Sequence, residues 1–264
     1  MILRLAGLLF LAAVVSAQKP SFEVASIKRN PSERDGGSLG PRADGLFATN
    51  VTLTNLLLLA YAPSSGQFLR TQIIGGPNWI NTDHFDLEAK REGNARAIPI
   101  EQLRAMLQSL LEDRFQLKTH QETRDLPVYH LVLAKGGPKL SADQTPPDPR
   151  QSFITFTTST EQLDPLLRGA MRMITAPSST TLLGTAVPLS RLVGLLQSRS
   201  GRIIIDQTNF TGLVDIHLEF SQDPAADSTP SLFTAIQDMG LKLDSAKAPL
   251  EALVIDSVQK PSEN

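Results

Sequence analysis

Two stretches of the chain each combine a helix-type apolar pattern with a strand-type pattern, in the same order. In residues 100–140, apolar side chains recur at helical spacing over IEQLRAMLQSLLEDRF, which predicts a helix. The residues that follow, FQLKTHQETRDLPVYHLVLAKGGPKL, predict a β-hairpin with arms at 115–121 and 128–135. Both faces of the second arm are apolar, so we expect that strand to lie inside a sheet.

The same pattern returns in residues 231–260, where SLFTAIQDMG predicts a helix and GLKLD with EALVIDSV predicts a hairpin. Two further helices are predicted, TLTNLLLLAY with Thr52 or Thr54 as N-cap and PLSRLVGLLQS ending before Gly201. Five segments predict strands: SFEVASIK, TQIIGG, HFDLEAK, RIIID and VDIHLEF. Residues 30–45 predict a loop, because glycines, prolines and charges show no apolar period there.

The order of these elements repeats between the two halves of the chain. The pattern therefore predicts an α+β fold of two similar helix–strand–strand–helix–hairpin modules, an internal duplication with mixed or antiparallel sheets. The modules are expected at 18–140 and 188–264. Residues 141–187 between them predict a linker and a poorly patterned segment, in which FITFTT favours a strand and TEQLDPLLRGAMR a short helix. The alternative is that any α+β chain alternates such elements.

The N-terminus predicts export. MILRLAGLLFLAAVVSAQ has one cation, a short apolar run and a small-residue ending, so residues 1–17 are expected to be a cleaved signal peptide. The run is shorter than the roughly 20 apolar residues that a membrane-spanning helix needs, so no membrane span is expected after cleavage. We expect a periplasmic or extracellular protein.

Composition narrows the classes of function. The chain has no cysteine, which excludes disulfides and lipoprotein anchoring at the cleavage site. Loss of Arg4 leaves 24 of the 25 basic residues against 27 acidic ones, a formal charge of −3, so nucleic acid is not an expected partner. No nucleotide-binding glycine motif, zinc motif or nucleophile elbow occurs, so no cofactor or metal is expected.

Several runs together resemble a known family. These are FEVASIKRN, NVTLTNLLLLAY, IIGGPNWINTDHFDLEAK, LLEDRFQLKTHQETRDLPVYHLVLAKGGPKL, IIIDQTNFTGLVDIHLEF and VIDSVQKPSEN. In this order they resemble the soil-associated family of exported bacterial proteins, known chiefly as a domain of unknown function. The resemblance implies export and brings no catalytic residues. Residues 188–258 are also similar in element order to the short N-terminal domain of secretins and TonB-dependent receptors, a module for protein contacts.

Five residues are candidates for a binding site: Trp79, His84, Asp86, His217 and Glu219. His84 with Asp86, and His217 with Glu219, each place an imidazole and a carboxylate on one strand face, and the two faces correspond if the halves are duplicated. A polar, solvated strand face is the favoured explanation of both pairs. Trp79, the only tryptophan, is expected either to anchor a ligand or partner or to plug the base of the sheet.

The sequence therefore favours a non-catalytic binding or interaction module of the cell envelope, with an envelope protein or peptide as partner. No catalytic residue can be assigned. Two alternatives stay open: a secreted hydrolase using the two strand faces, and a sensor domain that partners a membrane metallopeptidase. Hydrophobic strands with free edges suggest strand addition as one mode of contact.

Overall fold

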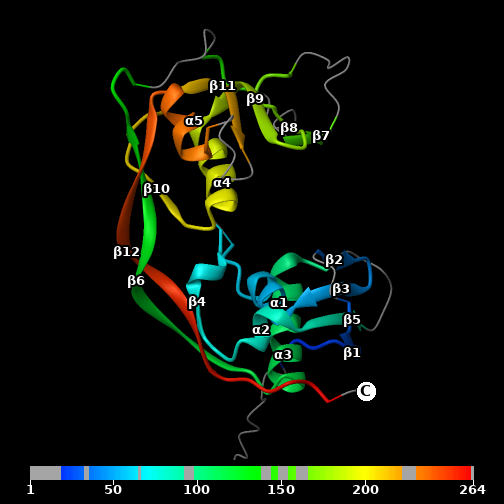
Figure 1. Cartoon of the computed structure of the whole chain (residues 1–264). Helices are drawn as coiled ribbons and strands as arrows, with labels where there is room; N and C mark the ends of the chain where they lie inside the picture. Colours follow the sequence, from blue (N-terminus) through cyan, green and yellow to red (C-terminus); the bar gives the residue numbers. More distant parts are fainter. Residues whose placement is uncertain are drawn as a thin grey trace, which may run out of the picture. The chain divides into compact units, whose positions relative to one another are not determined.

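The computed structural model describes residues 19–32, 36–64, 67–91, 98–137, 144–147, 154–158, 166–221 and 230–262. The predicted signal peptide and most of the predicted linker 141–152 lie outside these residues. The chain forms two compact units (Figure 1). Unit 1 comprises Met1–Ser64, Gly76–Lys118 and Asp256–Asn264, and unit 2 comprises Ser65–Gly75 and Thr119–Ile255. Each predicted module contributes to both units, so the predicted module boundaries do not coincide with those of the units.

Unit 1 is one antiparallel sheet with three helices. The strands, in spatial order, are β1 (Val24–Asn30), β5 (His84–Lys90), β3 (Gly45–Thr52) and β2 (Ser38–Arg42). The helices are α1 (Leu53–Ala60), α2 (Trp79–Thr82) and α3 (Ile100–Arg114). Alternate strand residues such as Ile27, Phe85 and Leu87 are buried, while their neighbours in sequence face the solvent. The sheet thus has an apolar inner face and a polar outer face.

The two main helices of unit 1 form as the sequence predicts. Thr52 caps α1 through a hydrogen bond from the Asn55 backbone N–H, and the Asn55 side chain accepts from the Thr52 N–H in return. The five apolar stripe residues of α3 are all buried: Leu103, Met106, Leu107, Leu110 and Leu111. Burial of one apolar stripe is what holds such a helix in place.

Unit 2 contains two mixed sheets. One has the order β10 (Ile204–Asp206), β6 (Lys118–Leu133), β12 (Leu241–Ser257) and β4 (Ile73–Gly75). The other has the order β11 (Leu213–Ser221), β9 (Ser179–Pro188), β8 (Met171–Thr175) and β7 (Ile154–Thr157). Helices α4 (Leu189–Ser200) and α5 (Leu232–Asp238) share a core with both sheets, in which Leu131, Leu182, Leu192 and Ile236 are fully buried. A single 3-10 turn, Arg70–Gln72, precedes β4.

Both predicted hairpins are wrong. Residues 115–135 hold one continuous strand, β6, and residues 241–257 hold one continuous strand, β12. Residues 122–127 and 245–250, where the two predicted hairpins need their turns, lie inside these strands. The two strands are neighbours in one sheet, so each segment has a backbone partner in another part of the chain and does not need to turn. The prediction that the second arm lies inside a sheet is confirmed, because β6 runs between β10 and β12.

Other predictions failed where strands carry little apolar alternation. The predicted loop 30–45 contains β2, and β3, β8 and β9 were not predicted. Residues 166–172 of the predicted helix 160–172 form no helix, and Met171 and Arg172 belong to β8, whereas residues 160–165 lie outside the described residues. The segment between the predicted strands TQIIGG and HFDLEAK contains the short helix α2, which the pattern does not predict. The strand FITFTT is confirmed as β7.

The observed elements repeat in order. Apart from the 3-10 turn and α2 in the first half and the intervening strands β7 and β8, the run β3–α1–β4–β5–α3–β6 has the same order as the run β9–α4–β10–β11–α5–β12. Strand β4 of the first run pairs in parallel with β12 of the second run, and β10 of the second run pairs in parallel with β6 of the first. Strands β10 and β4 therefore lie at the two edges of this sheet, with β6 and β12 between them.

Candidate functional site

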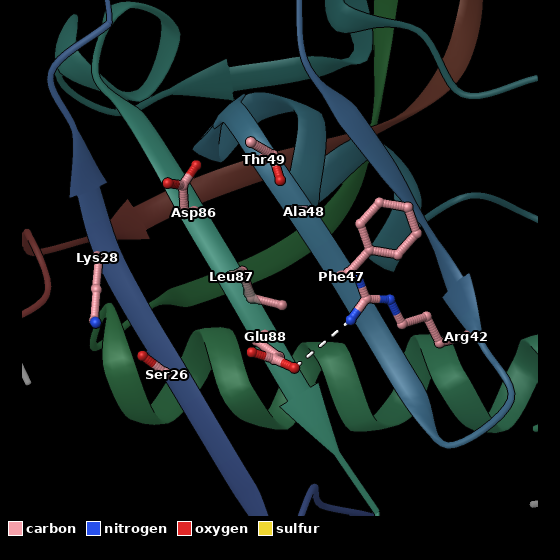
Figure 2. A pocket seen from close by; sticks show the side chains of 9 residues that line it. All are labelled: Ser26, Lys28, Arg42, Phe47, Ala48, Thr49, Asp86, Leu87 and Glu88. Carbon is pink, nitrogen blue, oxygen red and sulfur yellow. Dashed lines mark ion pairs between the residues drawn. The ribbon is translucent and has the colours of Figure 1, made fainter.

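The outer face of the unit 1 sheet is a polar surface. The strand register places side chains in rows across it, with Ser26 beside Glu88 and Glu88 beside Phe47 in one row. In the next row Lys28 lies beside Asp86. Helix α3 runs behind the sheet, on the side opposite these side chains (Figure 2). We call this surface the outer face.

A shallow hollow of about 230 Å³ lies on the outer face. Figure 2 shows its lining, which comes from all four strands of the sheet: Ser26 and Lys28 on β1, Arg42 on β2, Phe47, Ala48 and Thr49 on β3, and Asp86, Leu87 and Glu88 on β5. The hollow thus combines one aromatic ring, two cations and two carboxylates. A surface of this composition suits recognition of a polar or charged partner.

Both Arg42 and Glu88 are engaged within the hollow. A guanidinium nitrogen of Arg42 lies 3.6 Å from a Glu88 carboxylate oxygen, and the Lys90 ammonium lies 3.1 Å from the same oxygen. The Arg42 guanidinium also lies 4.6 Å from the centre of the Phe47 ring, as a cation–π contact. Lys28 makes no such ion pair among the described residues, so it is the cation most available to a partner.

Asp86 serves the structure of the sheet. The register between β3 and β5 shifts after Ala48, and the extra residues include Asn50, whose φ of 55° is left-handed. The Asn50 backbone N–H donates to Asp86 Oδ1 at 2.8 Å, and Asn30 Nδ2 donates to the same oxygen at 2.8 Å. The carboxylate therefore fixes a β-bulge.

His84 lies two residues before Asp86 on β5 and is half-buried. It lines a separate open groove of about 690 Å³ with Arg29, Asn30, Ser32 and Asp83, among others. The structure thus confirms that His84 and Asp86 share one face of β5, but only Asp86 lines the hollow.

Trp79 packs within unit 1. It begins α2 and is half-buried, with its ring 6.4 Å from Phe115 in a stacked arrangement and 6.4 Å from Phe85 edge to face. The Lys260 ammonium lies 5.7 Å above the Trp79 ring and donates to Asp83 at 2.7 Å. These contacts agree with the second role expected for Trp79, in which the indole packs against other aromatic rings at the base of the sheet.

His217 and Glu219 are exposed on β11 of unit 2, so the two predicted pairs belong to different units. Neither member of the second pair holds a bulge as Asp86 does. In unit 2 the residue that holds the bulge is Asp215, whose Oδ1 accepts from the Ala186 N–H at 2.8 Å, and Ala186 has a φ of 48°. Asp215 therefore makes the same kind of contact in unit 2 that Asp86 makes in unit 1.

Sequence reasoning missed Lys28, Arg42 and Phe47. Arg42 fell in the predicted loop, and β3 was not predicted at all. Leu46, Phe47 and Ala48 are all apolar, so GLFATNVT shows no alternation in sequence. Only the structure reveals that Leu46 and Ala48 are buried while Phe47 is partly exposed.

Comparison with known families identifies a domain of unknown function over most of the chain. The family model described as "Protein of unknown function (DUF3738)" matches residues 54–258, which is most of the chain. The chain belongs to this family. No curated protein and no solved structure matches the DUF3738 chain.

Two features are absent from the described ranges. No helix in them is both long and apolar enough to cross a bilayer. No group of three or more His, Asp or Glu side chains in them is placed to hold a metal ion.

Proposed function

We propose that this DUF3738 protein is an exported, non-catalytic binding module of the cell envelope that contacts its partner through the outer face of unit 1. Export rests on the signal-peptide pattern of residues 1–17. The observation that carries the binding role is the hollow, where an aromatic ring and charges of both signs lie on an uncovered sheet face.

The hydrogen bonds of Asp86 and the ion pairs of Glu88 favour a binding role over a catalytic one. A general base or nucleophile must be free to approach a substrate. Asp86 accepts two hydrogen bonds that hold the bulge, and Glu88 lies between Arg42 and Lys90. The hydrolase alternative would have to use these engaged groups, or the separate His217 and Glu219 of unit 2. The sensor alternative remains compatible, because a sensor domain also works by binding.

The proposal includes an internal duplication of the chain. Ile73, the first residue of β4, pairs with Leu253 of β12. Ile204, the first residue of β10, pairs with Tyr129 of β6, so each short strand pairs with the long strand of the other half. The repeated bulge, with an aspartate acceptor and a left-handed residue in each copy, supports the same relation. A duplicated scaffold explains why Asp86 and Asp215 recur without a catalytic role.

The test is direct binding. Envelope proteins retained by residues 18–264 are identified, and each is then purified and titrated against the wild type, Lys28→Ala and Phe47→Ala. Phe156→Ala is the control, because Phe156 is 69% exposed but lies in unit 2. We expect the two hollow variants to weaken binding about tenfold, as loss of a contact in the centre of an interface does, and the control to leave it unchanged.

The contrary result is also specific. Turnover of a peptide or glycan panel by the purified protein, abolished by His84→Ala or His217→Ala, would replace the binding role by the hydrolase. A partner that binds Lys28→Ala and Phe47→Ala as tightly as wild type would exclude the outer face as its contact surface.

A further inference from the structure

The outer edge of β11 lacks a strand that is present at the matching place in unit 1. Strands β5 and β11 match, because each pairs antiparallel with the strand before a helix and each supplies the aspartate of a bulge. On its other side β5 is covered by β1. Strand β11 ends its sheet, and no further strand covers it among the described residues.

The backbone groups that face this open side can be identified. Thr185 N donates to Ala170 O and Ala176 N donates to Ser179 O, so odd-numbered residues of β9 bond to β8 and even-numbered ones to β11. Their partners on β11 include Ile216 and Leu218. The N–H and C=O groups of the alternating residues Asp215, His217 and Glu219 therefore point to the open side.

Both ends of this edge are already satisfied by other groups. At one end the Gln144 side chain acts like a paired strand residue: Leu213 N donates to Gln144 Oε1 at 2.7 Å, and Gln144 Nε2 donates to Leu213 O at 2.9 Å. At the other end Ser221 N donates to Pro230 O at 2.9 Å. Residues 215–219 between them keep exposed side chains at positions 215, 217 and 219.

We propose that the edge of β11 binds an extended segment of a partner protein, in the way that β1 lies on β5, and that this segment carries basic side chains on its solvent face. Strand addition obtains affinity from main-chain hydrogen bonds and specificity from alternate side chains. In unit 1, Lys28 lies opposite Asp86 and Val24 opposite Lys90. The matching places on β11 are acidic, Asp215 and Glu219, so a basic residue fits opposite each.

A separate partner is the occupant we expect. The β1 strand of a second copy is already paired with its own β5. The inference goes beyond the proposed function, since it concerns another unit and another surface.

The probe is a synthetic peptide with the sequence of residues 22–30 and the change Val24→Lys, so that it carries a cation opposite both carboxylates. Amide hydrogen exchange of the protein is measured with and without it. We expect exchange at Asp215, His217 and Glu219 to slow at least about tenfold on binding, because these N–H groups gain acceptors. Ile216 and Leu218 are bonded to β9 in the free protein, so their exchange should stay the same.

Charge and backbone are separated by variants. A peptide with Lys28→Glu and Arg29→Glu should bind about tenfold more weakly, and the unchanged sequence of residues 22–30 up to about fivefold more weakly. In the protein, His217→Pro removes one outward N–H and should weaken binding about tenfold, whereas His217→Ala keeps that N–H and should not. Circular dichroism confirms that each variant folds, and the exchange experiment on the wild type stands if His217→Pro does not.

Three results would overturn the proposal. The first is unchanged exchange at all three outward amides with saturating peptide. The second is equal binding of the charge-reversed peptide. The third is slow exchange at these amides that depends on protein concentration without peptide, which would make a second copy the occupant. None of these results affects the Lys28 and Phe47 titrations, so the outer-face function stands or falls separately.

Discussion

Asp86→Ala tests whether a predicted site residue belongs to the scaffold. The substitution removes the oxygen that accepts from the Asn50 N–H and from Asn30 Nδ2, each at 2.8 Å. A hydrogen bond to a charged group contributes about 1.5–3 kcal/mol. The Asn30 donor is partly exposed and can turn to water, so most of the cost comes from the backbone N–H of the left-handed Asn50. We expect unit 1 to lose about 2–3 kcal/mol of unfolding free energy.

Glu88→Ala is the matched control. Glu88 lies two residues further along β5 and has the same charge, but its ion pairs at 3.1 and 3.6 Å join groups that are about half exposed. Such exposed pairs contribute about 0–1 kcal/mol. The two variants thus remove the same charge from the same strand and differ in what the carboxylate holds.

The assay is urea unfolding followed by the emission of Trp79, the only tryptophan of the chain. Trp79 contacts Phe85, the neighbour of Asp86, so its emission reports on unit 1. With a slope of about 1–3 kcal/mol per M, a loss of about 2–3 kcal/mol should lower the midpoint by about 0.7–3 M. A shift no larger than that of Glu88→Ala would refute the scaffold role and return Asp86 to the candidates for chemistry.

Three further predictions follow from the contacts. Asp215→Ala should destabilise unit 2 by about 2–3 kcal/mol while the Trp79 transition stays in place, with amide exchange in β9 as readout. Lys260→Ala should shift Trp79 emission to the red, because the ring loses the cation above it and gains water; an unchanged spectrum would contradict this contact. The hydrogen bond to Glu112, and then its charge, raise the pKa of Lys19 above the ordinary 10.5. That stabilisation is complete below pH 10.5 and is lost as pH rises through the folded pKa, so Glu112→Gln should lower the Lys19 pKa measured by NMR.

Elements with a strong internal period follow from the sequence. The stripe of α3 and the capping pair of α1 lie within one segment, so the sequence predicts both helices. The alternation of HFDLEAK likewise predicts β5 with its observed bounds. Strand β2, with the sequence SLGPR, has no such period. It forms because β3 supplies its hydrogen bonds.

The candidate site shows the same division. His84 and Asp86 fall on one strand face by alternation alone, and the sequence places them together correctly. That Asp86 lies beside Lys28 and holds Asn50 depends on the register of three strands. No local pattern gives this register, so the sequence does not distinguish an aspartate that fixes a bulge from one available for catalysis.

What the sequence by itself determined is which segments can form an amphipathic helix or strand, because side-chain periodicity is a local property. The tertiary structure alone decided whether residues 122–127 and 245–250 form hairpin turns or continue as strand. Backbone groups need partners but do not specify them, and neighbouring long strands supplied the partners here. The same pairing decided that β5 is covered and that β11 is left at an edge, which is where the proposed binding surface arises.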